Sequence, residues 1–485
     1  MQFKETIVRL LLLVVPFSVH SQTTYIPIQA KENILIDRLE IKAQTDSILN
    51  FSKTRPYSRM LFIPEIQQID STVSLSRVDE YNLRNAVLNN IEYANGETSG
   101  YLSLKPFLKS FYITPANFYQ VNTKDFFFTI NPVFQYIVAK EDNNSQHLFL
   151  NTRGISLRGR IGNKIGFSAY VTDNQERDPL YVQDLVRERQ AVPGEGYYKD
   201  FKGTGYDYFD AKGYITTKAT KYIDLVFGYD KNFIGNGYRS LFLSDFSNSA
   251  LFFKINTRIW RFNYQNLFME LVPTEREPNI GDKYVGHKYA ALHHLDIGLT
   301  KWLNVGLFEA IVFGRKNHFE FGYLNPVIFY RSIERENGSF DNSLAGMDAK
   351  ANIAHHLQLY GQLLLDEFSL HELKKKWWGN KYGIQMGAKY VDALSVSNLD
   401  LQLEWNIVRP FTYSHNDSVS SYTHNNQPLA HPLGANFSEI IAIARYQPAP
   451  KWMMEAKMIH YLQGRDTGST TFGSNIFLPD LASYR

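Results

Sequence analysis

Paired carboxylates are the first residues of this chain that could do chemistry, because glycoside hydrolysis uses two of them on either side of one bond. Asp366 and Glu367 are neighbours in the sequence. On a strand they point to opposite sides and cannot flank one bond together. A second carboxylate, such as Asp341 or Glu439, would have to come from another connection. No G-x-S-x-G or comparable nucleophile motif is present, so the residues favour a protein that acts without catalysis.

Histidines and cysteines are the residues that would mark a metal site. The chain has no cysteine, which removes thiolate ligands, thiol catalysis and disulfides together. His415, His424 and His431 fall in one stretch, but their spacing is loose and no H-E-x-x-H pattern accompanies them. The pairs at 293–294 and 355–356 are interpreted as lumen or turn residues. We therefore expect neither a metal nor a cofactor.

Alternation of apolar and polar residues dominates from about residue 125 onward. Phe126, Phe128 and Ile130 share one face, while Thr129 and Asn131 share the other, which is the period of a strand. About fifteen such segments are visible, and no helical pattern is long enough for a parallel α/β sheet. Further examples span 155–161, 165–171, 209–217, 295–299, 303–313, 357–365 and 399–405.

The connections between these segments alternate in length, with one exception of middling length at 392–398. Tight turns on the periplasmic side and extended loops on the outer side are typical of an outer-membrane barrel. A propeller would repeat in blades of four strands, and no such motif is present. The pattern predicts an all-β transmembrane barrel, with a soluble sandwich as the alternative. The short connections lie at 162–164, 219–222, 256–259, 300–302, 354–357 and 447–452, and the long ones at 173–206, 230–249, 272–288, 314–342, 366–382 and 408–437.

Charged residues on the strands fit a barrel with a wet interior. Arg158, Arg160, Asp224 and Lys254 interrupt otherwise apolar strands, and in a barrel they would face the lumen. Phe, Tyr and Trp make up 15% of the chain, a share typical of proteins with aromatic girdles or sugar platforms. The net charge of +3 gives no nucleic-acid footprint.

The amino-terminal region differs in pattern from the rest. Residues 1–22 are predicted to be a signal peptide cleaved near Ser21–Gln22, because Lys4 and Arg9 flank a short apolar run. Residues 23–105 are predicted to form a mostly helical domain, with helices in 32–42 and after the N-cap signature at Ser76. Residues 106–485 would then be the barrel.

Several stretches resemble one known family. They are "GNGYRSLFLSDF", "YLNPVIFYRS" with "FDNSLAGMD", "LLLDEF", "WWGNKYGIQMGAKYVDA" and the block from Glu404 to Glu439. They look like the Bacteroidetes branch of the Wzi capsule-assembly outer-membrane proteins, the branch that includes the gliding-motility protein RemB. The resemblance extends from about residue 25 to 480.

This resemblance implies a fold and a function. It implies an 18-stranded barrel in the Gram-negative cell outer membrane, a helical bundle at the periplasmic end, and a lectin-like role in holding surface polysaccharide for capsule assembly, adhesion or gliding. The implied partners are outer-membrane lipid, surface polysaccharide, and motility or capsule-export proteins, without nucleic acid. The alternatives are a passive porin and an outer-membrane carbohydrate-active enzyme.

The chain departs from the family at its end. It stops at "NIFLPDLASYR" without the alternating final strand and terminal aromatic residue that such barrels carry. We expect a truncated reading frame and a carboxy-terminally incomplete barrel that lacks about three strands by comparison with the family.

The stretches that carry the resemblance fall almost entirely in the long connections. Flat aromatic rings can stack on sugar faces, and planar polar groups can bind hydroxyls, which is how proteins hold oligosaccharides. The alternative is structural, since loops inside a barrel mouth need internal pairs such as Arg239 with Asp245 or Arg409 with Glu439. Gly235 and Gly237 are expected to let their loop fold back toward the mouth. The candidate polysaccharide-binding residues are Arg239, Asp245, Asn325, Arg331, Asp341, Asp366, Glu367, Trp377, Trp378, Asn380, Arg409, Tyr413, Tyr422 and Asn436.

Overall fold

A computed structural model describes residues 23–69, 73–162, 164–273, 286–315, 318–327, 329–338, 340–366, 379–466 and 471–480. Counting the three-residue β8, seventeen strands form one large antiparallel sheet curled as a barrel, which confirms the all-β prediction. The strands are β4 (Tyr119–Asn122), β5 (Phe126–Ala139), β6 (Leu148–Ile161), β7 (Ile165–Arg177), β8 (Lys199–Phe201), β9 (Gly205–Thr220), β10 (Ile223–Asp230), β12 (Ala250–Ile259), β13 (Phe262–Leu271), β14 (Lys288–Gly298), β15 (Leu303–Phe313), β16 (Asn342–Ile353), β17 (Leu357–Leu365), β18 (Tyr382–Tyr390), β19 (Leu399–Val408), β22 (Phe437–Ala449) and β23 (Trp452–Gln463).

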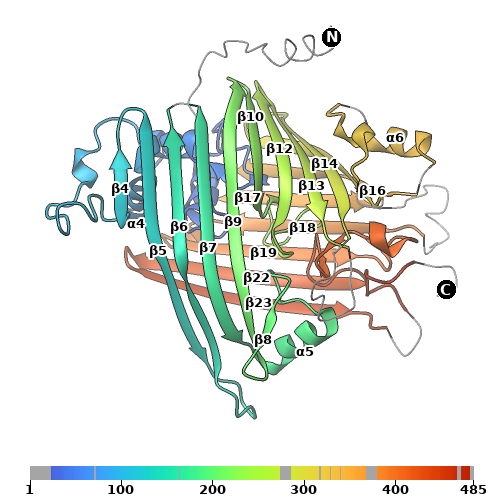
Figure 1. The fold of residues 1–485 in the computed structure, drawn as a ribbon. Coiled ribbons are helices and arrows are strands. Elements are labelled where there is room, and N and C mark those ends of the chain that lie inside the picture. Colours follow the sequence, from blue (N-terminus) through green and yellow to red (C-terminus); the bar gives the residue numbers. More distant parts are fainter. Residues whose placement is uncertain are drawn as a thin grey trace, which may run out of the picture.

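Long strands pair with their neighbours in chain order, from β5 beside β6 to β22 beside β23. In Figure 1, strands β5 to β9 stand in front and strands β17 to β23 cross behind them. The strand number is larger than the number of alternating segments in the sequence. The reason is that β4 has four residues and β8 has three, too few to show a period.

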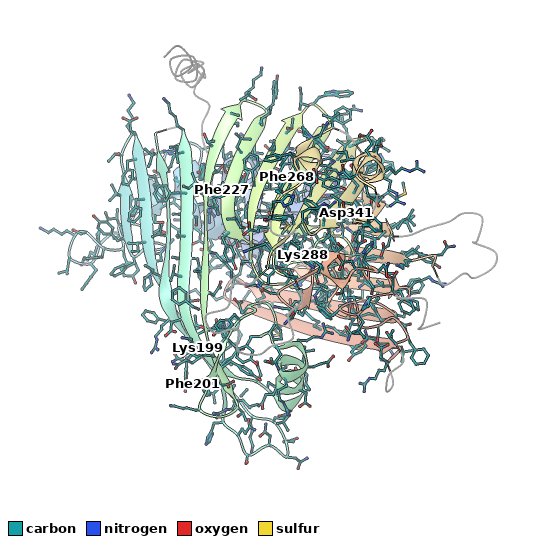
Figure 2. All side chains as sticks on the ribbon, turned by 45° about the vertical axis from the view of Figure 1, so that its right-hand side comes forward. Lys199, Phe201, Phe227, Phe268, Lys288 and Asp341 are labelled. Atoms are coloured by element: carbon teal, nitrogen blue, oxygen red, sulfur yellow. The ribbon has the colours of Figure 1, made fainter. Side chains whose placement is uncertain are left out.

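The two faces of the sheet have opposite character. On β10 and β12, Phe227 pairs with Phe253 on the outer face, and Val226 pairs with Lys254 on the inner face. Phe227 is 56% exposed, whereas Lys254 is buried and donates to Asn232. Figure 2 shows Phe227 and the fully buried Lys288, which lie on opposite faces. An apolar outside and a polar inside are what the alternation predicted.

The connections separate the barrel into a short-turn end and a long-connection end. Strands such as β12 and β13 are joined by two residues at the short-turn end, while β19 and β22 are joined by residues 409–436 at the long-connection end. The middling connection 391–398 belongs to the short-turn end, and its length has a reason: Asp392 and Asn398 bind Arg38 of the helical region.

A helical bundle covers the short-turn end. It consists of α2 (Glu32–Ala43), α3 (Arg59–Gln68) and α4 (Arg77–Asn89), and the predicted cap at Ser76 is present as a capping box with Asp79. An apolar core that includes Leu39, Ile63 and Val87 holds the helices together. None of the helices in the described part of the chain is long and apolar enough to cross a membrane.

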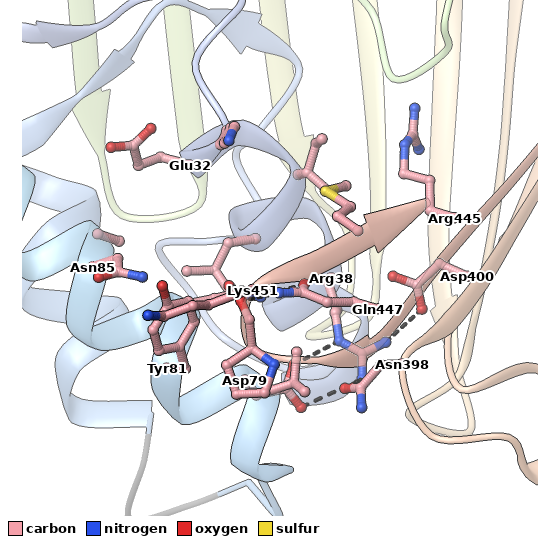
Figure 3. Close-up of a pocket in the computed structure, with 18 of the residues that line it drawn as sticks. Glu32, Arg38, Asp79, Tyr81, Asn85, Asn398, Asp400, Arg445, Gln447 and Lys451 are labelled. Carbon is pink, nitrogen blue, oxygen red and sulfur yellow. Dashed lines mark hydrogen bonds and ion pairs between the residues drawn. The ribbon is translucent and has the colours of Figure 1, made fainter. Parts of the chain in front are cut away.

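Arg38 is the main link between the bundle and the barrel. It is buried, and its guanidinium binds Asp79 at 2.7 Å and Asp400 (Figure 3). It also binds Asp392 at 2.6 Å. Lys42 adds a second cation at 2.9 Å from Asp79. Arg38 and Lys42 together outweigh burial and lower the pKa of Asp79 to about 2. The cluster therefore pins α2 and α4 to the rim of the barrel.

Candidate functional site

The lumen of the barrel is filled by its own chain. Residues 23–30 and 50–58, together called the N-terminal plug, enter from the short-turn end, and residues 231–249 and 409–436 fold in from the other end. These segments meet where β2 (Thr54–Arg55) pairs with β11 (Phe233–Ile234). Beside this ladder the Gly235 N–H donates to the Lys53 carbonyl at 2.8 Å. The N-terminal plug and the two inward connections are thus continuous through the lumen, and together they are called the plug.

Buried ion pairs fix the N-terminal plug and α2 to the wall. Lys53 is fully buried, and its ammonium lies 3.0 Å from Asp296 of β14 and 2.5 Å from Asp348 of β16. Lys350 binds Glu40 at 2.5 Å, and Lys389 binds Asp37 at 2.8 Å. Burial opposes the charged form of Lys53, but the two aspartates outweigh it and raise its pKa.

The filled lumen contains two cavities between residues that the structure describes. One, here called the tyrosine cavity, measures about 350 Å³ and lies against the inner face of β6, β7, β9 and β10. The other measures about 310 Å³ and lies between α2 and the inner face of β18, β19 and β22. Both are lined by Ile28, Gln29 and Asp245, so Asp245 stands where they adjoin.

The tyrosine cavity combines aromatic rings with charged groups. Tyr170 and Tyr208 line it together with Asp210, Lys212 and Glu195. The Lys212 ammonium lies 2.6 Å from Asp210 and 5.5 Å from the centre of the Tyr170 ring. Burial raises the pKa of Glu195, which comes from the connection between β7 and β9. Rings for stacking beside donors and acceptors for hydroxyls are the groups that a sugar ring requires.

The second cavity is more strongly charged. Asp37, Arg55 and Lys389 line it, with Asp400 and Arg445 opposite. Arg55 and Lys389 both bind Asp37, and together they outweigh burial and lower its pKa to about 2. The lining residues therefore already satisfy one another, and of the two cavities the tyrosine cavity is the better candidate for a ligand.

The connection 231–249 brings two predicted residues into the lumen. The N–H groups of Tyr238 and Arg239 donate to Glu404 of β19 at 2.6 and 3.0 Å. The guanidinium of Arg239 lies 3.8 Å from Glu439, so its acidic neighbour is Glu439 and the pair with Asp245 is not formed. A Cβ on Gly237 would lie 2.3 Å from Glu404, which makes close approach the reason for this glycine.

Tyr413 and Tyr422 form the centre of the plug. Both are fully buried, their rings stack at 5.8 Å, and the Tyr413 hydroxyl donates to the Leu241 carbonyl at 2.6 Å. The Tyr413 N–H donates to Asp366 at 2.7 Å. In this structure these rings hold two inward connections together, and they line neither of the two cavities.

The remaining predicted residues are dispersed. Arg409 lies over the Tyr382 ring at 5.5 Å, Asn436 donates to the Phe472 carbonyl, and Asn380 is buried. Asn325, Arg331 and Asp341 belong to a connection that leaves the lumen and is described below. Glu367, Trp377 and Trp378 lie outside the described residues. Of the predicted set, only Asp245 lines the tyrosine cavity.

The histidines of the plug serve as hydrogen-bonding groups. No cluster of three or more His, Asp or Glu side chains suited to a metal occurs in the described ranges. His431 binds Glu439 at 2.7 Å. His424 links two other loops: it accepts a hydrogen bond from the Val272 N–H and bonds to the Ser249 carbonyl, each at 3.0 Å. Burial lowers the pKa of His424 to about 4.

The plug should loosen in acid because of His424. Its pKa is lower in the folded state than the ordinary 6.5, so an opened plug binds more protons and closure weakens as the pH falls from about 6.5 to 4. The full loss is on the order of 3 kcal/mol. The protection factor of the Val272 amide, which corrects the exchange rate for its intrinsic slowing in acid, should fall between pH 7 and pH 4.5. In His424→Gln most of this fall should disappear, and a protection factor of the unaltered chain that does not change with pH would contradict the assignment.

Comparison with known proteins gives a structural match but no sequence match. No protein-family model matches the chain, and no curated protein matches it in sequence. A solved structure of Wzi from Escherichia coli, described as an outer membrane protein involved in group 1 capsule assembly and a carbohydrate-binding β-barrel, is similar at a TM-score of 0.54 and 13% identity, covering 91% of this chain and 86% of that one. Pseudomonas aeruginosa OprD matches at a TM-score of 0.35 and 11% identity, over 70% of this chain and 74% of that one. The fold of this chain is a β-barrel similar to that of the outer-membrane protein Wzi.

Proposed function

We propose that this protein is an outer-membrane barrel that binds or organises surface polysaccharide without chemistry, in the manner of a lectin. The observation that carries the proposal is the filled lumen, which leaves a tyrosine-lined and carboxylate-lined cavity in place of a channel. The likeness to a barrel described as carbohydrate-binding supports it. The long-connection end would face outward and the helical bundle would face the periplasm, after removal of residues 1–22.

The tyrosine cavity is the proposed contact site for the sugar. Asp245, predicted from the sequence, contributes a carboxylate at its border, and Tyr170, Tyr208, Asp210 and Lys212 complete it. Arg239 and the predicted residues of the connections that fold inward stay in the proposal as groups that lead the polymer toward the cavity, whereas those of the connection between β15 and β16 do not. Capsule assembly, adhesion and gliding are the roles in which such binding would be used, with capsule-export or motility proteins as partners.

Tyr170 offers the sharpest test of this site. Tyr170→Ala removes the ring, and we expect it to weaken binding of purified surface glycan roughly tenfold, the equivalent of about 1.4 kcal/mol. Tyr170→Phe keeps the ring and should retain most of the affinity. Isothermal titration calorimetry of the detergent-solubilised barrel would measure both.

A matched control lies on a neighbouring strand. Tyr136 of β5 is 72% exposed and does not line the cavity, so Tyr136→Ala should bind glycan like the unaltered chain. Equal binding by Tyr170→Ala and the unaltered chain would exclude the cavity as the site. Release of shortened glycan during the titration would favour the carbohydrate-active enzyme instead.

A further inference from the structure

The connection between β15 and β16 folds onto the outside of the barrel. Its described residues 318–327, 329–338 and 340, here called the flap, include α6 (Tyr330–Glu336). Tyr323, Tyr330 and Ile333 of the flap form one buried cluster with alternate residues of the wall, Phe268, Tyr289, Ala291, Ile311 and Phe313. The intervening residues Met269, Ala290, Leu292, Ala310 and Val312 belong to a separate cluster with the plug inside the lumen.

Because successive side chains of a strand point to opposite faces, the two clusters lie on opposite sides of the wall. Figure 1 shows α6 beside β14, outside the sheet. Asn325 and Arg331 therefore lie on the outside of the barrel. The prediction from the sequence that they bind sugar in the barrel mouth is not supported by this position. Asp341 closes the base of the flap, with Arg315 bound at 2.6 Å and the Tyr323 hydroxyl at 2.7 Å.

The flap covers a polar patch on the outer face of the wall. His293 and Glu309 are direct partners across β14 and β15, and the His293 ring nitrogen lies 2.9 Å from the carboxylate. The Tyr330 hydroxyl lies 2.6 Å from the other ring nitrogen, and the Tyr330 N–H donates to Glu309 at 3.1 Å. On β13, the Tyr264 hydroxyl donates to the Pro326 carbonyl at 2.6 Å. His293 and Glu309 lie midway along β14 and β15, where an uncovered polar pair would face hydrocarbon.

The outer surface of the flap carries four large apolar side chains. Phe321, Val327, Phe329 and Phe340 are exposed by 81%, 84%, 74% and 76%. On α6 the flap also exposes Arg331, Arg335 and Glu336. The neighbouring wall is apolar, since Leu307 of β15 and Met347 of β16 are 49% and 46% exposed. The apolar part of the flap thus continues the apolar band of the barrel, beside the charged residues of α6.

We propose that the flap is a lipid-seated element: its exposed phenylalanines and valine contact acyl chains of the outer leaflet, while Tyr330 seals His293 and Glu309 beneath them. This rests on the outer-membrane location proposed above. Bilayer lipid is the occupant that fits these four exposed apolar side chains, because they continue the apolar outer wall and would be an aggregation site in water. The flap is then a lipid-binding element, distinct from the glycan site in the lumen.

The absence of cysteine makes a direct test simple, because any introduced cysteine is the only one. We would label Phe329→Cys with a nitroxide in phosphatidylcholine vesicles and measure relaxation by oxygen and by a water-soluble nickel chelate. Met386→Cys, on the outer face of β18 and 57% exposed, is the lipid control. Asp184→Cys on α5 (Leu180–Arg189), with a 68% exposed side chain, is the water control.

The expected result is that position 329 behaves like position 386, with high oxygen and low nickel accessibility. Adding Tyr330→Phe should raise the nickel accessibility of the label severalfold, since the flap loses its bond to His293. A label at 329 that behaves like the one at 184 would overturn the proposal. Spin–spin broadening between copies would also overturn it, because a second copy would then cover the flap. If position 386 is itself in water, the membrane location fails first and this proposal fails with it.

Discussion

Lys53→Met should release the N-terminal plug from the barrel wall. The substitution leaves Asp296, Asp348 and the adjacent His294 without their buried cation, and breaking a buried ion pair on one side costs about 3–5 kcal/mol. We expect a loss of this size in the free energy of unfolding of the plug, measured by hydrogen exchange of residues 50–58 in detergent.

A second variant and a control separate charge from packing. Lys53→Met combined with Asp348→Asn removes one of the uncompensated carboxylates, so the double variant should be more stable than Lys53→Met alone. Lys31→Met removes an exposed lysine at the start of α2 and should change nothing. If Lys53→Met and Lys31→Met exchange alike, the buried pair does not hold the plug.

Arg38→Ala should detach the helical bundle from the short-turn end. It removes the group that binds Asp79, Asp392 and Asp400 together and leaves only Lys42 to offset them. The expected cost is again about 3–5 kcal/mol, because all three carboxylates are at least partly buried. Limited proteolysis should then cut the region of α2 and α4 in Arg38→Ala at protease concentrations that leave the unaltered chain intact.

The control for Arg38→Ala is a residue that lines the same cavity as Arg38. The space between α2, α4 and the β22–β23 turn measures about 330 Å³ and is lined by Arg38, Lys31, Asn82 and Lys451, among others. Lys451→Ala removes an exposed cation there and should leave proteolysis unchanged. Equal resistance of Arg38→Ala and Lys451→Ala would show that other contacts, such as Asn82 with Gln447, hold the bundle.

The barrel itself could be predicted because its signal is local. Alternation fixes which side chains share a face, so Arg158 and Lys254 were placed in the lumen correctly, where they bind Glu92 and Asn232. The cap at Ser76 is equally local. The position of each long connection in the barrel has no local signal, because it depends on partners far away in the sequence, such as Leu241 for Tyr413.

The outward path of the flap had one signal in the sequence. His293 and Glu309 fall on the lipid-facing parity of adjacent strands, where a polar pair needs a cover. The ligand residues predicted from the sequence come from the long connections. They therefore do not include Tyr170, Asp210 and Lys212, which line the tyrosine cavity from inward positions of β7 and β9. Tyr413 and Tyr422 have rings that could stack on a sugar, yet both side chains are fully buried and belong to the plug.

Conductance of the reconstituted chain in a planar bilayer tests the central claim most directly. Because the N-terminal plug and the inward connections meet at the β2–β11 ladder, the unaltered chain should insert yet pass almost no ionic current, and Lys53→Met should produce open steps. Large and steady open-channel currents from the unaltered chain would contradict a filled lumen and would identify a porin.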